Sequence, residues 1–260
     1  KEDNNGNIWF ETANGISSYD GKRITNHSLI GNSNSQNEWT KTSNDLWFSA
    51  GNKEGVYKYD GQRLNYLAFP NPKVINPNNL YSVTSISKGK NNILWFGTYA
   101  GVFGYNGSDF IIINDETLEL DIETDPLHIR SIFEDSKGRL WIGNNGIGVL
   151  LRDADTIINF SEKNNLIHPT SSRRGDKSQP GTLEHVFAIE EDGKGNIWFG
   201  DRDTGVWKYD GDTLKNYTDS LGQSNDFVHC IYKDNNDALW FILTNGNVFK
   251  FNGKTFDKQF

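Results

Sequence analysis

The stretch IEEDGKGNIWFGDRDTGVWKYDGDTLKNYT, residues 189–218, decides the fold. It alternates short apolar segments with turns: DGKGN carries the Gly and Asn that tight hairpins need for positive φ, and YDG supplies the next hairpin. Together with the apolar segment VFA just before it, the stretch predicts four short antiparallel strands of about five or six residues each. No helical periodicity lies between them.

The Trp of this stretch recurs along the whole chain. It falls at Trp9, Trp47, Trp95, Trp141, Trp198 and Trp240, at intervals of 38, 48, 46, 57 and 42 residues. Six copies of a four-stranded antiparallel unit predict an all-β fold, a six-bladed β-propeller, with an open sandwich of six units as the alternative. We expect a single domain over residues 1–260, with blades at about 1–36, 37–79, 80–126, 127–182, 183–224 and 225–260.

The first copy is incomplete. In units three to six an apolar strand precedes the Trp, whereas unit one begins at Lys1, within the turn segment KEDNNGN. The first blade is therefore expected to lack its innermost strand, and residues before Lys1 are expected to cover the edge that this leaves. The chain contains no methionine, so we expect a signal peptide or another N-terminal segment to have been removed.

Composition excludes several classes of protein. A formal net charge of -8 disfavours a nucleic-acid binder, which needs a basic face to neutralise phosphates. No apolar run approaches the roughly 20 residues that span a bilayer. Because Cys230 is the single cysteine, an internal disulfide and a multi-thiolate metal site are both excluded.

The run 189–218, with its five partial copies, resembles the two-component-regulator propeller repeat of bacteria. The resemblance covers essentially the whole chain and is specific to the repeat type. It implies a propeller of the kind found in periplasmic sensor modules of hybrid histidine kinases, or in free-standing secreted or lipid-anchored proteins. The implied location is periplasmic or extracellular, with a lipid anchor on a removed N-terminal segment as a further option.

Candidate site residues are selected by their position in the propeller. The first strand of each blade lines the central channel, and the loops at one face form the usual ligand site. Tyr81, His128 and His185 stand at the starts of channel-lining strands, and Arg130 and His229 lie two residues along theirs. Loops and linkers add Glu11, Trp39, Tyr99, Arg173, Arg174, Asp201 and Arg202.

The histidines allow two interpretations. His128, His185 and His229 come from three successive blades, so they could converge on a polar pocket for proton transfer or ligand hydrogen bonds. Each could instead bond to a backbone carbonyl within its own blade. The repeated Trp is expected to pack between blades, whereas Trp39 lies outside that register, near the channel mouth, and is the better candidate for stacking on a ligand.

The arginines also allow two interpretations. Arg130 needs an anionic or carbonyl partner if it is buried, and Asp201, Asp203 or a ligand carboxylate could supply one. Arg173 and Arg174 stand side by side in the polar loop HPTSSRRGDKSQPG. They could clamp an anion, or they could simply be solvated.

The functional prediction is an exported module that binds or senses a small molecule, a glycan or a peptide at the loop face. One alternative is a metal-dependent lyase or a lactonase-type hydrolase, because the repeat is distantly similar to that of streptogramin lyases, whose LWFTE-type strings are close to IWFET here. That resemblance implies His and Glu with a divalent metal. A platform for a protein partner is the second alternative. No HExxH, GxSxG or phosphate-loop motif occurs, and no catalytic residue, metal ligand or cofactor is assigned.

Overall fold

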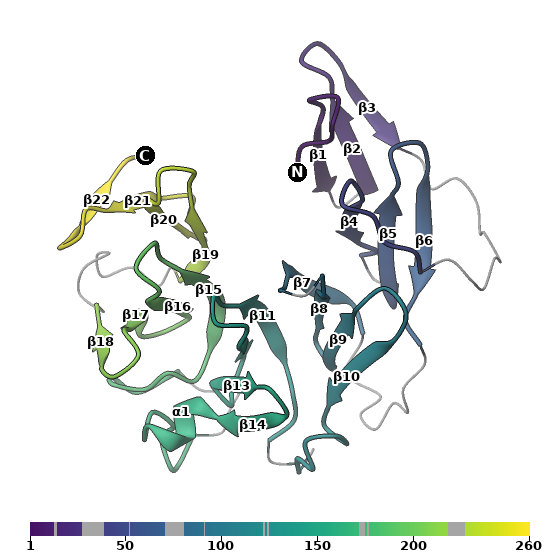
Figure 1. Ribbon diagram of the computed structural model, residues 1–260. Coiled ribbons are helices and arrows are strands. Elements are labelled where there is room, and N and C mark those ends of the chain that lie inside the picture. Colours follow the sequence, from purple (N-terminus) through teal and green to yellow (C-terminus); the bar gives the residue numbers. More distant parts are fainter. Residues whose placement is uncertain are drawn as a thin grey trace.

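The computed structural model describes residues 1–260 except 13–14, 28–38, 52, 71–80, 91, 122, 124, 172–174, 176 and 218–226. The described chain forms six antiparallel sheets. In Figure 1 these sheets follow one another around a centre in chain order, and an opening separates the first sheet from the last. The predicted all-β fold of six antiparallel units is confirmed.

Each sheet is a meander whose neighbouring strands are consecutive in the chain. The first two sheets comprise β1 (Ile8–Thr12), β2 (Gly15–Tyr19) and β3 (Ile24–His27), then β4 (Leu46–Ser49), β5 (Gly55–Tyr59) and β6 (Leu64–Ala68). The third and fourth comprise β7 (Val83–Lys88), β8 (Leu94–Thr98), β9 (Gly101–Tyr105) and β10 (Phe110–Asn114), then β11 (Ile129–Glu134), β12 (Leu140–Asn144), β13 (Val149–Asp153) and β14 (Thr156–Asn159), followed by α1 (Phe160–Lys163). The fifth and sixth comprise β15 (Val186–Glu191), β16 (Ile197–Asp201), β17 (Gly205–Tyr209) and β18 (Leu214–Asn216), then β19 (Val228–Lys233), β20 (Leu239–Leu243), β21 (Val248–Phe251) and β22 (Phe256–Lys258).

The first sheet has three strands, as expected. Where the third to sixth sheets place an innermost strand, the first sheet has only a short pairing: Glu2 forms an isolated bridge with Ile8. The amino group of Lys1 donates to the carbonyl of Trp9 at 2.7 Å. The second sheet also has three strands among the residues that the structure describes.

The acidic turn and the Trp form one structural unit. Asp192 Oδ1 accepts hydrogen bonds from the backbone N–H groups of Lys194 and Asn196, each at 2.9 Å, and Asp192 Oδ2 accepts from the indole N–H of Trp198 at 2.9 Å. Burial alone would raise the pKa of Asp192, but hydrogen bonds from Asn196 and Trp198 outweigh it, so the pKa lies below its ordinary value. The same Asp-to-indole bond, six residues apart, joins Asp3 to Trp9, Asp135 to Trp141 and Asp234 to Trp240.

In the first five sheets the repeated Trp packs its sheet against the next one, whereas Trp240 of the sixth sheet is partly exposed. The Trp141 ring lies 5.5 Å from Phe199, and the Trp198 ring lies 5.6 Å from Phe241 and 4.8 Å from Phe251. The Trp141, Trp198, Phe199 and Phe241 rings are wholly buried and Phe251 is partly buried. Burial of these apolar rings stabilises the contact between the sheets. The prediction that the repeated Trp packs between sheets is confirmed for five of its six copies, and the described contacts of Trp240 lie within its own sheet.

Candidate functional site

A β-bulge recurs at one position of the innermost strands. In β7, β11, β15 and β19 the pairing with the next strand skips one residue. The skipped residues are Thr84, Arg130, Phe187 and His229. A bulge re-aims a side chain out of the regular alternation. Accordingly Arg130 is partly exposed between buried Ile129 and Ser131. The bulges therefore re-aim one side chain in each of these four sheets, on the strands that lie nearest the centre of the ring (Figure 1).

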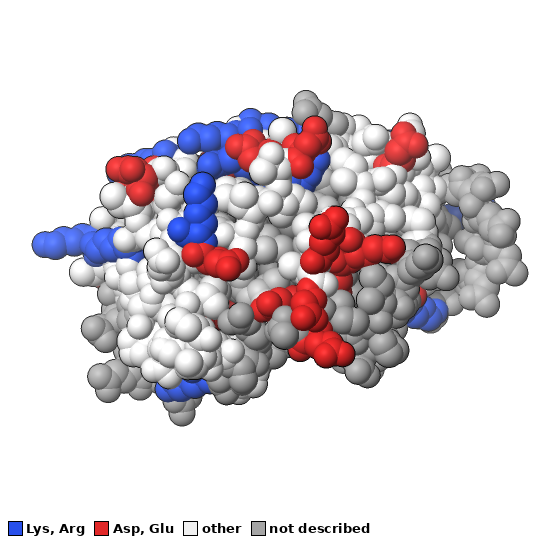
Figure 2. Space-filling view, turned by 90° about the horizontal axis from the view of Figure 1, so that it is seen from below, with Lys and Arg blue, Asp and Glu red and all other residues white. Residues whose placement is uncertain are grey.

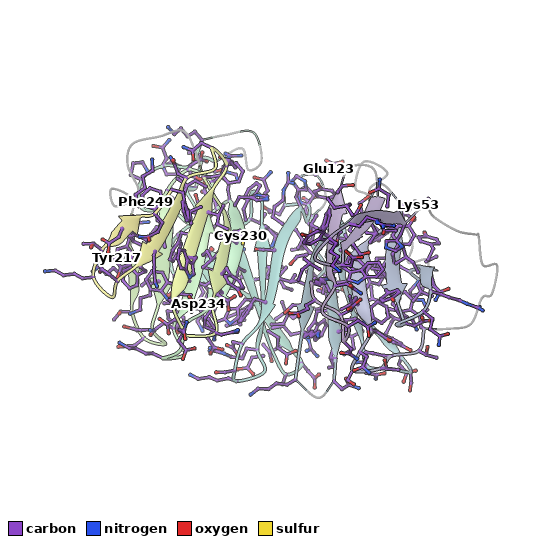
Figure 3. The ribbon with its side chains drawn as sticks, turned by 90° about the horizontal axis from the view of Figure 1, so that it is seen from above. Lys53, Glu123, Tyr217, Cys230, Asp234 and Phe249 are labelled. Carbon is purple, nitrogen blue, oxygen red and sulfur yellow. The ribbon has the colours of Figure 1, made fainter. Side chains whose placement is uncertain are left out.

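Loops from different sheets gather at one edge of the ring. Figure 3 shows Lys53, from the loop after β4, and Glu123, from the linker after β10, near one edge of the molecule. Asp234, from the turn between β19 and β20, lies toward the opposite edge. The loop between β4 and β5 and the linker after β10 thus lie toward the same face, in agreement with the face that the sequence analysis assigned to such loops and linkers.

Arg130 lies between two aromatic rings. Its guanidinium carbon is 5.0 Å from the centre of the Tyr99 ring and 4.9 Å from that of Phe187. Its Nη1 donates to the Tyr99 hydroxyl at a long 3.4 Å, and its buried Nε has no hydrogen-bond partner. Within the described part of the chain no carboxylate forms an ion pair with it. Cation–π contacts stabilise the guanidinium, but its charge is not neutralised.

The neighbouring Arg202 is neutralised. Its Nε and Nη2 donate to Asp203 Oδ2 at 3.0 and 2.7 Å, and its Nη1 donates to Asn145 Oδ1 at 3.4 Å. Asn145 Nδ2 lies 3.1 Å from His128 Nδ1, and His185 Nε2 lies 3.9 Å from Asp203 Oδ2. A polar network therefore joins the fourth and fifth sheets beside Arg130.

The carboxylate of Asp203 is held in its ionised form. Burial alone would raise its pKa, but the hydrogen bond from Arg202 and the nearby positive charge outweigh burial, so the pKa of Asp203 lies below its ordinary value. With Arg202 and the backbone N–H of Ser178 bound to its Oδ2, Asp203 is committed to this network. It does not serve as the partner of Arg130.

Asp201, the other predicted partner of Arg130, holds the backbone instead. Its Oδ2 accepts from the N–H groups of Glu184 and His185 at 3.1 and 2.9 Å, and its Oδ1 accepts from those of Asp203 and Thr204 at 2.8 and 2.9 Å. Complete burial raises the pKa of Asp201 to about 6, despite these bonds. The carboxyl therefore fixes the loop that carries Arg202 and Asp203.

Aromatic rings extend from Phe187, which contacts Arg130, to the sixth sheet. Phe187 lies 4.7 Å from Phe227, and Phe227 lies 6.3 Å from the exposed His229. On the other side, the Tyr99 ring lies 5.1 Å from His128. The structure thus brings seven of the predicted residues to one region, namely Tyr99, His128, Arg130, His185, Asp201, Arg202 and, at its margin, His229.

The remaining predicted residues lie elsewhere. Glu11 accepts from the backbone N–H of Ser49 at 3.1 Å, between the first two sheets. Tyr81 and Trp39 pack in the apolar core of the second and third sheets. The expected place of Trp39 near the channel mouth is therefore not observed: its indole N–H donates to the carbonyl of Ala68 at 3.1 Å, and its ring packs among Trp47, Phe69, Phe96, Tyr105 and Phe110. Arg173 and Arg174 lie outside the described residues.

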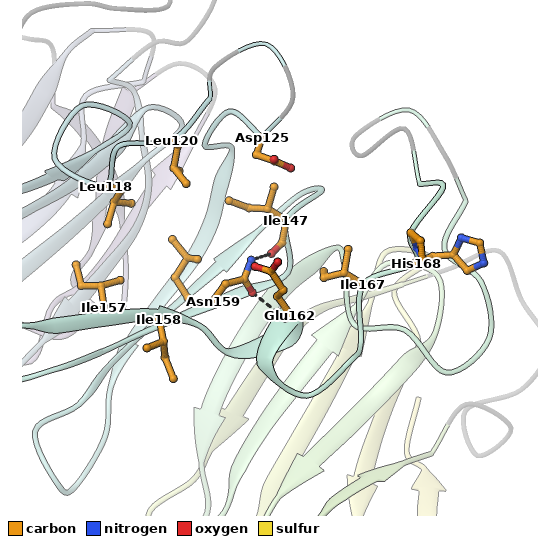
Figure 4. Close-up of a pocket in the computed structure, with 12 residues that line it drawn as sticks. Leu118, Leu120, Asp125, Ile147, Ile157, Ile158, Asn159, Glu162, Ile167 and His168 are labelled. Carbon is orange, nitrogen blue, oxygen red and sulfur yellow. Dashed lines mark hydrogen bonds between the residues drawn. The ribbon is translucent and has the colours of Figure 1, made fainter.

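A cavity of about 380 Å³ lies between the linker after β10 and the segment around α1. Figure 4 shows its apolar walls, with Leu118 and Leu120 from the linker and Ile158 and Ile167 opposite, and polar groups that include Asp125, Glu162 and His168. The sequence analysis did not select this cavity. Its only signal is the alternation of Leu with acids in TLELD, residues 117–121.

Acidic side chains mark the outside of this part of the molecule. Figure 2 shows several of them gathered near the middle of the rim that is seen from below.

Among the described residues, no group of three or more His, Cys, Asp or Glu side chains is arranged to hold a metal ion. No described helix has the length and apolar character needed to cross a membrane.

One protein family model matches part of this chain. The family model described as two component regulator propeller matches residues 125–146, which include β11 and β12 and carry His128 and Arg130. The resemblance expected from the repeat is confirmed by this match. No curated protein matches the chain.

Several solved structures share the fold. The extracellular domain of the hybrid two component system BT3049 from B. thetaiotaomicron is 21% identical, with a TM-score of 0.68 over 98% of this chain and 33% of that one. That of BT4673 from the same organism is 18% identical, with a TM-score of 0.67 over 100% and 32%. Virginiamycin B lyase from Staphylococcus aureus is 14% identical, with a TM-score of 0.70 over 100% and 82%. These identities establish the fold alone, and this chain spans about a third of the length of the two extracellular domains.

Proposed function

We propose that this propeller is an extracytoplasmic sensing module that binds a small ligand at the loop face over the central channel. The two-component regulator repeat and the extracellular propellers that share the fold support the sensing role. The cluster of polar and aromatic side chains from the third to the sixth sheet supports the place of binding.

The observation that carries the proposal is the contrast between two arginines of one cluster. Arg202 is bonded to Asp203, whereas Arg130 has aromatic rings on two sides and no described carboxylate. A partly buried guanidinium without an anion carries a desolvation penalty that a bound anion removes. The ligand is therefore a carboxylate or a comparable anion, with a ring or other apolar body that contacts Phe187 or Phe227.

The experiment is a thermal-shift comparison of acids with their neutral analogues. Glucuronate is paired with glucose, and N-acetylphenylalanine with its amide. A specific ligand at a hundred times its Kd stabilises the folded protein by about 2.7 kcal/mol. We expect one of the two acids to raise the melting temperature, its neutral partner to raise it much less, and Arg130→Gln to abolish the shift.

The matched control is Arg63→Gln, because Arg63 is exposed and far from the channel in its own turn. This variant should retain the full response to the acid. The proposal is contradicted if neither acid shifts the melting temperature, if the neutral analogue acts equally, or if Arg130→Gln responds like the unmodified protein.

A further inference from the structure

The cavity between the linker after β10 and the segment around α1 is distinct from the cluster around Arg130. Its volume of about 380 Å³ falls in the range of small-molecule sites. Eight of its twelve lining residues are Leu, Ile or Pro, and none belongs to the polar network of Arg202 and Asp203. The cavity therefore offers a ligand a mainly aliphatic surface.

The linker wall of the cavity is held by local hydrogen bonds. The backbone N–H of Leu118 donates to the carbonyl of Asn114, and that of Leu120 donates to the carbonyl of Asp115, each at 3.0 Å. The buried carboxylate of Asp115 accepts from the N–H of Leu127 at 2.8 Å. These bonds fold the linker back on itself and fix the positions of its two leucines.

The opposite wall is held in the same way. The carboxylate of Glu184, which is 1% exposed, accepts from the backbone N–H of His168 at 2.6 Å. The side-chain amide of Asn159 donates to the carbonyl of Ile147 at 3.1 Å (Figure 4). Because both walls are fixed by bonds within the protein, a ligand that enters the cavity has little structure to order, which favours binding.

The charged groups at the cavity are acidic. Asp125 comes from the linker and Glu162 from α1, and no Lys or Arg is among the described lining residues (Figure 4). Residues 106–129 contain seven acidic residues and no Lys or Arg. No described ion pair neutralises Glu162, and the adjacent Lys163 does not line the cavity. The electrostatic potential here favours a cation.

We propose that this cavity binds an organic cation with an aliphatic chain, of the alkylammonium class. The chain contacts the leucines of the linker and Ile158, whose side chains are only partly buried, and gains free energy as its apolar surface leaves water. The ammonium group lies near the carboxylates of Asp125 and Glu162, which attract it. This second site selects the charge opposite to that of the anion proposed for Arg130, and it stands independently of that proposal.

The test compares three ligands that share one chain and differ in charge: hexylammonium, hexanol and hexanoate. Saturation-transfer NMR at low ionic strength, where charges are screened least, measures the Kd of each. We expect hexylammonium to bind about fivefold more tightly than hexanol, and hexanoate not to bind. Leu118→Trp should abolish the binding of hexylammonium, because the larger side chain fills the cavity. Glu162→Gln should weaken it by about two- to fivefold.

The matched control is Glu116→Gln, because Glu116 is an exposed acid of the same linker that does not line the cavity. It should leave the Kd of hexylammonium unchanged, and so should Arg130→Gln, which separates this site from the proposed anion site. Glu162 is exposed, so its variant keeps the test valid even if Leu118→Trp does not fold. The proposal is overturned if hexanol or hexanoate binds as tightly as hexylammonium, or if Glu162→Gln binds like the unmodified protein. Full affinity in a folded Leu118→Trp variant would overturn it as well.

Discussion

Trp198 and Trp240 occupy the same repeat position in neighbouring sheets, yet their surroundings differ. Both donate an indole hydrogen bond to an Asp six residues earlier, at 2.9 and 2.8 Å. Trp198 is wholly buried by the sixth sheet, whereas Trp240 is partly exposed. The turn bond therefore belongs to each repeat by itself, while burial of the ring depends on the sheet that follows. A repeat protein of this type is stabilised by its junctions as much as by its units.

The largest expected effect follows from removing Trp198, the buried residue of this pair. Trp198→Ala should lower the free energy of unfolding by about 3–5 kcal/mol, because it leaves a cavity between two sheets. Trp240→Ala should cost about 1–2 kcal/mol, mainly through its hydrogen bond and its partial burial. Chemical unfolding of both variants measures the difference. Equal losses would show that the junction contributes nothing beyond the turn.

The next effect depends on pH. The last residue of β16, in the fifth sheet, is the buried Asp201, and the last residue of the corresponding strand β20, in the sixth sheet, is Leu243. Burial raises the pKa of Asp201 from 3.8 to about 6, so the folded state binds this proton more tightly than the unfolded state. Its contribution to stability is therefore present below pH 4 and is lost as the pH rises toward 6, by on the order of 2–3 kcal/mol.

Asp201→Asn should remove that dependence, because the amide carries no charge to desolvate. The measurement is the free energy of unfolding at pH 4.5 and pH 7 for both proteins. We expect the advantage of the unmodified protein over the variant to be larger at pH 4.5. A difference between the two proteins that stays constant over this range would contradict the raised pKa.

A smaller effect sharpens the role of the turn. Asp192→Asn should destabilise the protein by about 1–2 kcal/mol, since the amide group cannot accept all the hydrogen bonds that the carboxylate accepts. Asp234→Asn should cost less, because water reaches that turn more freely. Unfolding of the two variants side by side, at neutral pH, tests the order. A larger loss at Asp234 would mean that the exposed turn is the more important one.

The smallest effect concerns the exposed face of the first sheet, which carries Ile8, Tyr19 and Ile24. Ile8 and Ile197 share a repeat position, but Ile8 is 45% exposed and Ile197 is 1% exposed. Ile8→Thr should change the free energy of unfolding by no more than about 0.5 kcal/mol. Ile197→Thr should cost about 2 kcal/mol, because it places a hydroxyl in the apolar junction. Thermal unfolding of the two variants measures the difference. An equal cost at both positions would contradict the exposure of Ile8.

Much of the fold was predictable because the residues within each repeat determine its local structure. The Asp–Gly turns and the Trp–Phe strands fix the hairpins through bonds only a few residues apart, so six sheets followed from six copies. Position in the repeat likewise led to His128, Arg130, His185 and Arg202. It failed for Trp39, because nothing local shows that this ring packs among Trp47, Phe96 and Tyr105 of two different sheets.

Sequence by itself determined the class of fold, the number of repeated units and the packing role of the repeated Trp. Those features depend on spacing and on turn chemistry, which act over short distances. Only the tertiary structure decided which acid pairs with which arginine, that Asp203 is bound to Arg202 while Arg130 has aromatic neighbours, and which apolar faces stay uncovered. These depend on side chains from separate sheets, and their contacts exist only once the sheets have packed.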